Sequence, residues 1–169
     1  RVAVQIDGAR VEEERFPGRQ GRLLFAYLVA ERGRAVPRDE LAEALWGEQP
    51  PASWDKALTV LASKLRAALA DAGLDGRELL TAAFGCYRLD LPDRTWIDVI
   101  AAAEAAQEAE DALAAGDPEH AREAASRAAS LARPPFLPGD DGAWVDAKRH
   151  ELADVLVRAL ACLADACSR

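Results

Sequence analysis

The chain has 169 residues, half of them hydrophobic, and a net charge of −8. That length suits one medium domain or two small ones, and the apolar content is sufficient for a packed core. No uncharged apolar window of about eighteen residues and no signal sequence occurs, so the sequence predicts a cytoplasmic protein without a membrane segment. The three cysteines, Cys86, Cys162 and Cys167, are too sparse for a disulfide framework and are predicted to be reduced, buried small residues.

The negative charge is unevenly distributed along the chain. Residues 1–91 carry 13 Lys and Arg against 14 Asp and Glu, a net charge of −1, whereas residues 92–169 carry 8 against 15, a net charge of −7. The acidity that argues against a nucleic-acid partner therefore belongs to the second half. We predict two modules, 1–91 and 92–169, that meet at Pro92.

The first half has the pattern of a hairpin, three helices and a second hairpin. Apolar alternation on both sides of Asp7-Gly8 predicts a hairpin over residues 2–16. Helical spacing of apolar residues predicts three helices, over 20–32, 37–46 and 53–72. Gly33 is placed to end the first helix, Pro37 lies in the first turn of the second, and Ser53 is a good N-cap for the third. Two short extended runs, 79–81 and 86–89, predict a closing hairpin or wing.

The second half is rich in alanine and predicts three further helices, roughly over 96–115, 118–133 and 143–166. Gly116 ends the first of these helices and Asp117 caps the next. The segment between the last two helices contains Phe136 and Leu137, which need burial. We therefore predict a fixed loop over residues 133–142.

Two stretches carry a family resemblance. The first comprises GRAVPRDEL at 33–41, ALWG at 44–47, Pro50-Pro51, ALTVLASKLR at 57–66 and YRL at 87–89. It resembles the Streptomyces antibiotic regulatory protein family, whose members carry an OmpR-type winged helix. The second comprises ALAAGDPE at 112–119, LARPPFL at 131–137 and Trp144. It resembles the bacterial transcriptional activator domain, which follows that winged helix and consists of tetratricopeptide-like helix pairs.

The resemblance implies a mostly helical α+β chain. Residues 1–91 would form an OmpR-type winged-helix DNA-binding domain with N-terminal strands and a C-terminal wing hairpin. Residues 92–169 would form the all-α activator domain, incomplete at its C-terminal end. The implied function is a DNA-binding transcription regulator, an activator. Its implied partners are promoter double-stranded DNA, RNA polymerase, and a second copy bound as a dimer or in tandem on DNA.

Helix 53–72 is the implied recognition helix, since major-groove readout requires donors on the outward face of one helix. With its leucine stripe inward, a step of about 100° per residue directs the candidate DNA contacts outward or to the flank. They are Ser53, Trp54, Lys56, Thr59, Val60, Ser63, Lys64 and Arg66. Arg22 and Arg38, near the starts of the two preceding helices, are candidate phosphate contacts.

Lys56 is the best placed of these residues to reach a guanine edge or a phosphate. Thr59 and Ser63 suit a base or the backbone, Val60 suits a thymine methyl group, and Lys64 suits phosphate. Trp54 would either pack on the preceding helix or protrude toward the DNA backbone or a neighbouring molecule. Taken without the resemblance, the favoured interpretation of this helix is an ordinary amphipathic helix whose lysines face water.

The wing argues against this function. The resemblance implies an arginine and a glycine before the Tyr-Arg-Leu element, but Ala83 and Cys86 stand there. Fewer cations weaken the electrostatic part of DNA binding, so we predict weak monomer affinity that tandem sites or dimers would compensate. A degenerate winged helix that no longer binds DNA, and serves as a protein-interaction or sensory scaffold, is the alternative.

The sequence predicts no enzyme. His120 and His150 are the only histidines, and each lies in a charge-rich helical segment without ligands at metal-binding spacing. Neither a phosphate-binding loop nor a dinucleotide-binding turn occurs. We therefore predict no catalytic residue, no metal and no cofactor.

Overall fold

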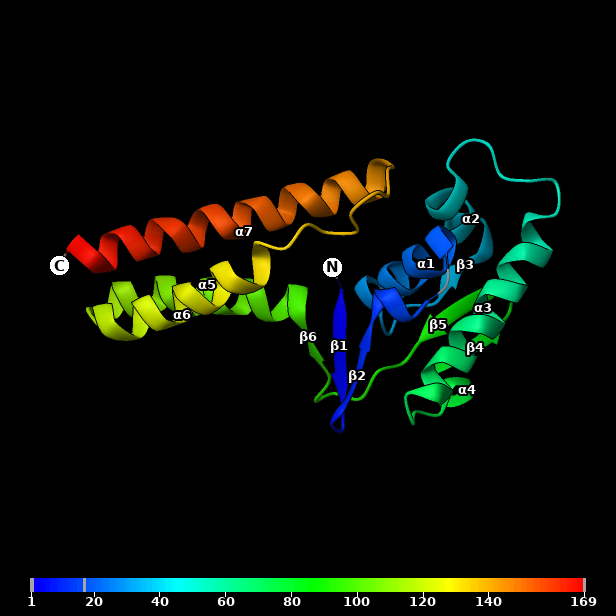
Figure 1. Cartoon of the computed structure of the whole chain (residues 1–169), viewed down its shortest axis with the longest axis horizontal. Helices are drawn as coiled ribbons and strands as arrows, with labels where there is room; N and C mark the ends of the chain where they lie inside the picture. Colours follow the sequence, from blue (N-terminus) through cyan, green and yellow to red (C-terminus); the bar gives the residue numbers. More distant parts are fainter. Residues whose placement is uncertain (1, 17, 169) are drawn as a thin grey trace. The chain divides into compact units, whose positions relative to one another are not determined.

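The computed structural model describes residues 2–16 and 18–168 and shows a mostly helical α+β chain (Figure 1). Its contacts divide it into two compact units, Val2–Thr95 and the residues from Trp96 onward. Each unit is described by itself below. Among the described residues, no helix combines the length and the apolar character that crossing a membrane would require.

The first unit begins with the predicted hairpin. Strands β1 (Ala3–Ile6) and β2 (Ala9–Glu12) pair antiparallel, with Ile6 opposite Ala9. Asp7 and Gly8 have φ angles of 46° and 86°, as a tight two-residue turn requires, so the Asp-Gly turn is confirmed. The second strand is shorter than predicted, because a 3-10 helix (Glu13–Arg15) follows it directly. The charged run from Glu12 to Arg15 offers no alternating apolar face that would extend a strand.

Three helices pack around one core in this unit: α1 (Gly18–Ala30), α2 (Arg38–Trp46) and α3 (Trp54–Asp71). The predicted inward stripe of α3 is confirmed, since Leu58, Ala62, Leu65 and Leu69 are all buried. Leu61, at the margin of that stripe, is only half-buried. Gly33 has the positive φ expected of a residue that ends a helix.

Two local predictions are wrong in detail, and one short helix was not predicted. Pro37 lies not in a helix but in a two-residue strand, β3 (Val36–Pro37), and α2 starts at Arg38. Ser53 stands at the N-cap position of α3, yet its side chain accepts no capping hydrogen bond. A one-turn helix, α4 (Gly76–Leu79), was not predicted, since one turn is too short to show helical periodicity. The Asp75 carboxylate caps this helix by accepting hydrogen bonds from the backbone N–H groups of Arg77 and Glu78.

The predicted closing hairpin is present as strands β4 (Leu80–Ala83) and β5 (Cys86–Leu89). Together with β3 they form a three-stranded sheet in the order β3-β5-β4. Val36 of β3 lies opposite Tyr87 of β5, and the backbone N–H of Gly33 donates to the carbonyl of Leu89. The hairpin is therefore tied to the segment between α1 and α2, far away in sequence.

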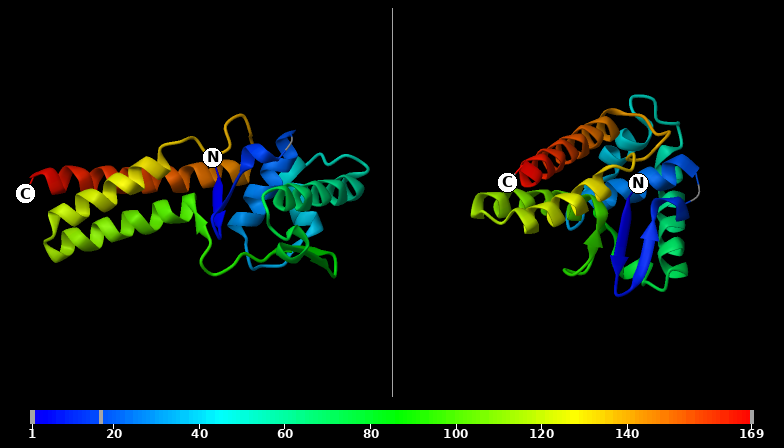
Figure 2. Two further views of the ribbon diagram at one scale, coloured as in Figure 1. Left: turned by 60° about the horizontal axis from the view of Figure 1, so that its bottom comes forward. Right: turned by 60° about the vertical axis from the view of Figure 1, so that its left-hand side comes forward.

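The second unit consists of a two-residue strand, β6 (Trp96–Ile97), and three helices, α5 (Asp98–Ala115), α6 (Pro118–Ala132) and α7 (Ala143–Ser168). The two further views in Figure 2 show these helices running alongside one another, and α6 packs on both of its neighbours. Gly116 adopts the left-handed conformation, and the Asp117 carboxylate accepts from the N–H of His120, so both predicted caps are confirmed. Alanine dominates the helix contacts, which lets the backbones approach closely.

The loop between α6 and α7 is anchored as predicted. Phe136 and Leu137 are buried, and the Phe136 ring meets Trp144 edge-on at 5.7 Å between centroids. Arg149 of α7 donates to the backbone carbonyl oxygens of Phe136, Leu137 and Asp140. One guanidinium thus satisfies loop carbonyls that helix or sheet would otherwise pair.

All three cysteines are free, in keeping with the prediction that they are reduced. Cys162 is buried, and Cys86 is half-buried. The prediction of burial is wrong for Cys167, which is exposed. The two cysteines of α7 are five positions apart, so they face in different directions from the helix.

Candidate nucleic-acid interface

The side of α3 that faces away from the core carries most of the candidate DNA contacts. Val60 is 53% exposed, although an apolar side chain gains nothing from facing water. Five polar candidates are likewise exposed: Ser53, Lys56, Thr59, Ser63 and Lys64. Trp54 and Arg66 are half-buried. The structure therefore brings the predicted groove-facing set onto one accessible surface, which we call the outer face of α3.

The two lysines of the outer face have no anionic partner within the described part of the chain. Lys56 and Lys64 are eight residues apart, which corresponds to about 12 Å along a helix. Val60 and Ser63 lie between them. The outer face thus presents two unpaired ammonium groups around a short polar and apolar strip, a composition suited to an anionic, grooved surface.

Arg38 at the start of α2 joins three elements of the first unit. Its Nε donates to Asp55 Oδ1 at 2.7 Å, and its Nη2 donates to the Asp55 carbonyl at 2.7 Å and to Thr59 Oγ1 at 2.8 Å. Its Nη1 donates to the hydroxyl of Tyr87 on β5 at 2.9 Å. The guanidinium therefore ties the first turns of α3 to α2 and to the wing, and most of its donors are used within the protein.

Thr59 belongs to the same network. Its hydroxyl donates to the carbonyl of Asp55 at 3.0 Å while it accepts from Arg38. Arg38 and Thr59 were each predicted as DNA contacts, but the hydrogen bond between them was not predicted. That contact joins residues far apart in the sequence, which periodicity within single helices does not reveal.

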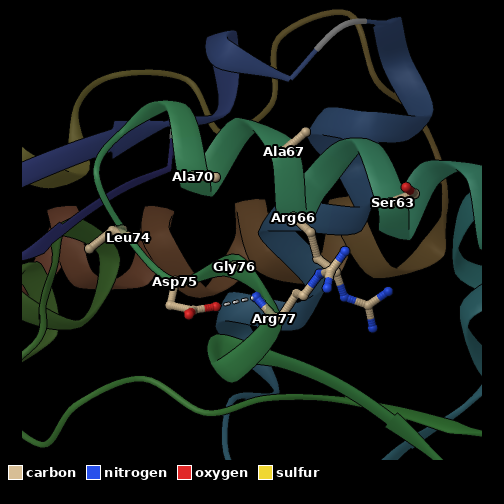
Figure 3. A pocket seen from close by; sticks show the side chains of 8 residues that line it. All are labelled: Ser63, Arg66, Ala67, Ala70, Leu74, Asp75, Gly76 and Arg77. Carbon is tan, nitrogen blue, oxygen red and sulfur yellow. Dashed lines mark hydrogen bonds between the residues drawn. The ribbon is translucent and has the colours of Figure 1, made fainter.

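The second half of α3 borders a pocket of about 510 Å³. Figure 3 shows its lining residues, which come from α3, from the following turn and from α4. Ser63 and Arg66 lie on its α3 side, and Arg77 enters from α4. Arg66 also donates from Nε to the carbonyl of Leu80 at 2.9 Å, so its outer guanidinium nitrogens are aimed from a fixed stem.

Arg77 is a candidate that sequence reasoning missed. It shares the pocket with Arg66 because α4 approaches the backbone of α3 very closely at Gly76. A Cβ added at Gly76 would lie 2.3 Å from the carbonyl oxygen of Arg66. The Asp-Gly pair at 75–76 was the available signal, since aspartate caps and a buried glycine permits a close approach.

A second polar network holds α1 against α2. Tyr27 of α1 donates from its hydroxyl to Glu40 Oε1 at 2.7 Å, and Arg34 donates to both oxygens of the same carboxylate. The hydrogen bond from Arg34 is the largest cause that lowers the pKa of Glu40 below its ordinary value of 4.5. Burial, followed by the hydrogen bond to Glu40, raises the pKa of Tyr27 well above its ordinary value.

Acid is therefore expected to loosen this part of the first unit. Because the folded-state pKa of Glu40 lies below its unfolded value, the carboxylate stabilises the fold above pH 4.5 and loses that contribution as the pH falls through its folded pKa. A Glu40→Gln variant should show a shallower loss of stability with falling pH below about 4.5 when thermal midpoints are followed across a pH series. An unchanged slope would show that Glu40 does not act in this way.

The wing ends in a fully exposed aromatic residue. Ala83 and Cys86 pair across the hairpin, which leaves Phe84 and Gly85 as a two-residue turn. Both have positive φ angles, 50° for Phe84 and 74° for Gly85, and the relative exposure of Phe84 is 104%. For a residue other than glycine, this conformation costs on the order of 1 kcal/mol. No lysine or arginine occurs between residues 81 and 86, so the wing tip carries no cation.

Arg22, the remaining candidate, is half-buried on α1. His120 and His150 are exposed on helices of the second unit. Across residues 2–16 and 18–168, no three histidine, cysteine or carboxylate side chains are arranged to hold a metal ion.

The chain is similar in sequence to known regulatory proteins. Residues 15–89 match the family described as "Transcriptional regulatory protein, C terminal". The chain is 35% identical over 135 residues to "Regulatory protein AfsR" of Streptomyces coelicolor, a match that covers 80% of this chain and 13% of that protein. It is 43% identical over 74 residues to "Transcriptional regulatory protein EmbR" of Mycobacterium tuberculosis, a match that covers 44% of this chain and 19% of that protein.

A solved structure resembles the chain over both units. It is that of "Mycobacterium tuberculosis EmbR in complex with low affinity phosphopeptide", with 34% sequence identity and a TM-score of 0.82. The match covers 96% of this chain and 42% of that one. The chain spans less than a fifth of the length of the two curated relatives named above.

Proposed function

The chain belongs to the Streptomyces antibiotic regulatory protein family, and on that premise we propose that it is a sequence-specific DNA-binding regulator, an activator, that reads the major groove with α3. The family identification confirms the resemblance seen in the sequence. The two relatives that match this part of the chain are named as a regulatory protein and as a transcriptional regulatory protein. A regulator that reads a promoter acts where the chromosome lies, so the proposal places the chain in the bacterial cytoplasm.

The observation that carries the proposal is the outer face of α3, with two unpaired lysines on a helix whose opposite side is buried. Lys56, near the N-terminal end of α3, is positioned to meet a guanine edge or a phosphate. Val60 offers a contact for a thymine methyl group, and Ser63 can bond a base or the backbone. Lys64 would contact phosphate.

The arginines of the first unit divide into two roles in this proposal. Arg66 and Arg77 line one pocket beside the outer face and suit a backbone phosphate, because guanidinium groups match its oxygens. Arg38 is a positioning residue, since its donors orient the first turns of α3 and hold the wing. Thr59 is held in the same network, so its role is the orientation of Arg38 and α3.

In this proposal the module predicted over residues 92–169, which contains the second unit, serves protein contacts. The sequence of this half resembles the activator domain of the family, and α7 exposes two large apolar side chains, Val157 and Leu160. RNA polymerase and a second copy of the chain are the proposed partners. Pairing of two copies on tandem sites would compensate for the few cations of each wing.

Removing the two lysines of the outer face should weaken DNA binding and its salt dependence together. A Lys56→Ala, Lys64→Ala variant is expected to bind about 10- to 100-fold more weakly at about 50 mM salt, and the slope of log affinity against log salt should fall by about 2. The measurement is fluorescence anisotropy with a duplex that the unmodified chain has enriched from a random-sequence pool.

The matched control removes two exposed arginines from the second unit, Arg122→Ala with Arg133→Ala, and should leave both affinity and slope unchanged. If the unmodified chain shows no salt-sensitive binding at about 50 mM salt, the proposal fails. The absence of cations from the wing tip would then favour the alternative function as a protein-interaction or sensory scaffold.

A further inference from the structure

The tip of the wing is a single aromatic side chain, and we propose that Phe84 is a wedge that enters the minor groove of bound DNA and partly unstacks one base step. The inference deepens the proposed function and rests on it, since it assigns the wing a contact beside the one made by α3. It names the chemistry of that contact as apolar insertion between bases.

The backbone at Phe84 is arranged for a different kind of residue. A two-residue turn with both φ angles positive favours asparagine, aspartate or glycine at its first position. Phe84 occupies that position with a φ of 50° and a fully exposed ring. Neither packing nor backbone preference accounts for phenylalanine there, and strain combined with exposure at one residue is typical of a site that acts on a ligand.

The rest of the wing suits entry into a narrow groove. Ala82 and Ala83 precede the tip and Gly85 follows it, so the arm that carries the ring is slender. The minor groove of B-form DNA is only about 6 Å wide, and proteins that enter it commonly insert phenylalanine between base pairs. The side chain that the wing presents is one of those used for this purpose.

Electrostatic contact by the wing is poorly supported, which strengthens the apolar assignment. Residues 81–86 contain no lysine or arginine. Arg88, the cation nearest the tip along the hairpin, is paired with Asp90 at 2.7 Å. The wing of this chain would therefore replace a cationic contact with an aromatic one.

A wedge of this kind implies a sequence preference without hydrogen bonds to bases. Unstacking and kinking cost least at pyrimidine–purine steps such as TA and CA. We therefore infer that one such step flanks the segment read by α3, and that A-tracts, which are stiff, are disfavoured at that position.

The test compares Phe84→Gly and Phe84→Leu with the unmodified chain. The probe is an alternating TA duplex of about two helical turns that contains 2-aminopurine, with an uninterrupted A-tract duplex as its counterpart. The chain should raise 2-aminopurine fluorescence on the TA duplex, because unstacking relieves its quenching. Phe84→Gly should lose that signal and bind about 10-fold more weakly, while Phe84→Leu keeps most of both.

Thermal unfolding separates a lost contact from a lost fold. Glycine suits the turn better than phenylalanine, so Phe84→Gly should unfold at the same temperature as the unmodified chain or higher. If Phe84→Gly and the unmodified chain bind the TA duplex with equal affinity and give equal fluorescence, the wedge is overturned while DNA binding stands. The exposed ring would then be left to contact a partner protein. Absence of binding by the unmodified chain to these two duplexes and to the duplex enriched from the random-sequence pool would instead overturn the proposed function itself.

Discussion

Replacement of Gly76 by alanine is expected to lower the free energy of unfolding of the Val2–Thr95 unit by about 3 kcal/mol, the upper end of the range for overpacking. The added Cβ would lie 2.3 Å from the Arg66 carbonyl oxygen and 2.8 Å from its Cα. Both atoms belong to the backbone of α3, which cannot rotate away as a flexible side chain can. Either α4 or α3 must shift, although alanine is by itself the better helix former.

Calorimetry of the whole chain measures this effect as a drop in the thermal midpoint of the first unit, on the order of 10 °C or more. Gly73→Ala is the matched control. Gly73 has a φ of 84° and nothing within 4 Å of an added Cβ, so only conformational strain of about 1 kcal/mol is expected. Equal losses for the two variants would show that the close approach at Gly76 has no special cost.

Gly76→Ala should also weaken DNA binding if the proposed function holds. A displaced α4 moves Arg77 out of the pocket that it shares with Arg66. It also disturbs the hydrogen bond from Arg66 to the carbonyl of Leu80, where the wing begins. The glycine thus connects the packing of a one-turn helix to the surface beside the outer face of α3.

Removal of the Arg38 side chain is expected to have a comparable effect. Arg38→Ala would leave the Asp55 carboxylate and the Tyr87 hydroxyl without their partner and detach the first turns of α3 from α2. Hydrogen bonds that involve a charged group contribute about 1.5–3 kcal/mol each, but they share one side chain and do not add fully. We expect a loss of about 3 kcal/mol in the free energy of unfolding of the first unit, measured by urea denaturation.

A graded series separates the contacts of Arg38. Tyr87→Phe removes one acceptor and should cost about 1 kcal/mol. Arg38→Lys keeps the charge but lacks the guanidinium group that reaches three elements. Its loss in the free energy of unfolding should fall between those of Tyr87→Phe and Arg38→Ala. If Arg38→Ala is as stable as the unmodified chain but binds DNA more weakly, Arg38 contacts phosphate directly and the bracing role is wrong.

The regular elements could be predicted from the sequence because their signals are local. Gly33, Gly116 and Asp117 were recognised at helix ends, where a positive φ or a capping carboxylate follows from residue type alone. The buried stripe of α3 was recognised from its spacing. β3 and α4 were missed, since a two-residue strand and a single helical turn have no periodicity to detect.

The candidate site was only partly predictable for a related reason. Lys56, Val60, Ser63 and Lys64 share the outer face of one helix, so a wheel was sufficient to group them. Arg77 lies beside this face because the backbones of α3 and α4 approach each other closely at Gly76. Arg38 is held by hydrogen bonds to Asp55 and Tyr87, which are 17 and 49 residues away in sequence. Such relations depend on tertiary packing.

The sequence by itself determined the family, the order of the elements and the side of α3 that faces away from the core, because each follows from motifs or from a periodicity within one segment. Tertiary structure alone decided which cations on that surface are available and which are engaged. It showed that Arg38 is held inside the first unit, that Arg77 lies beside Arg66, and that Phe84 projects from a strained turn. The physical reason is that hydrogen-bond partners, close approaches and backbone angles arise between segments distant in sequence, where no local pattern records them.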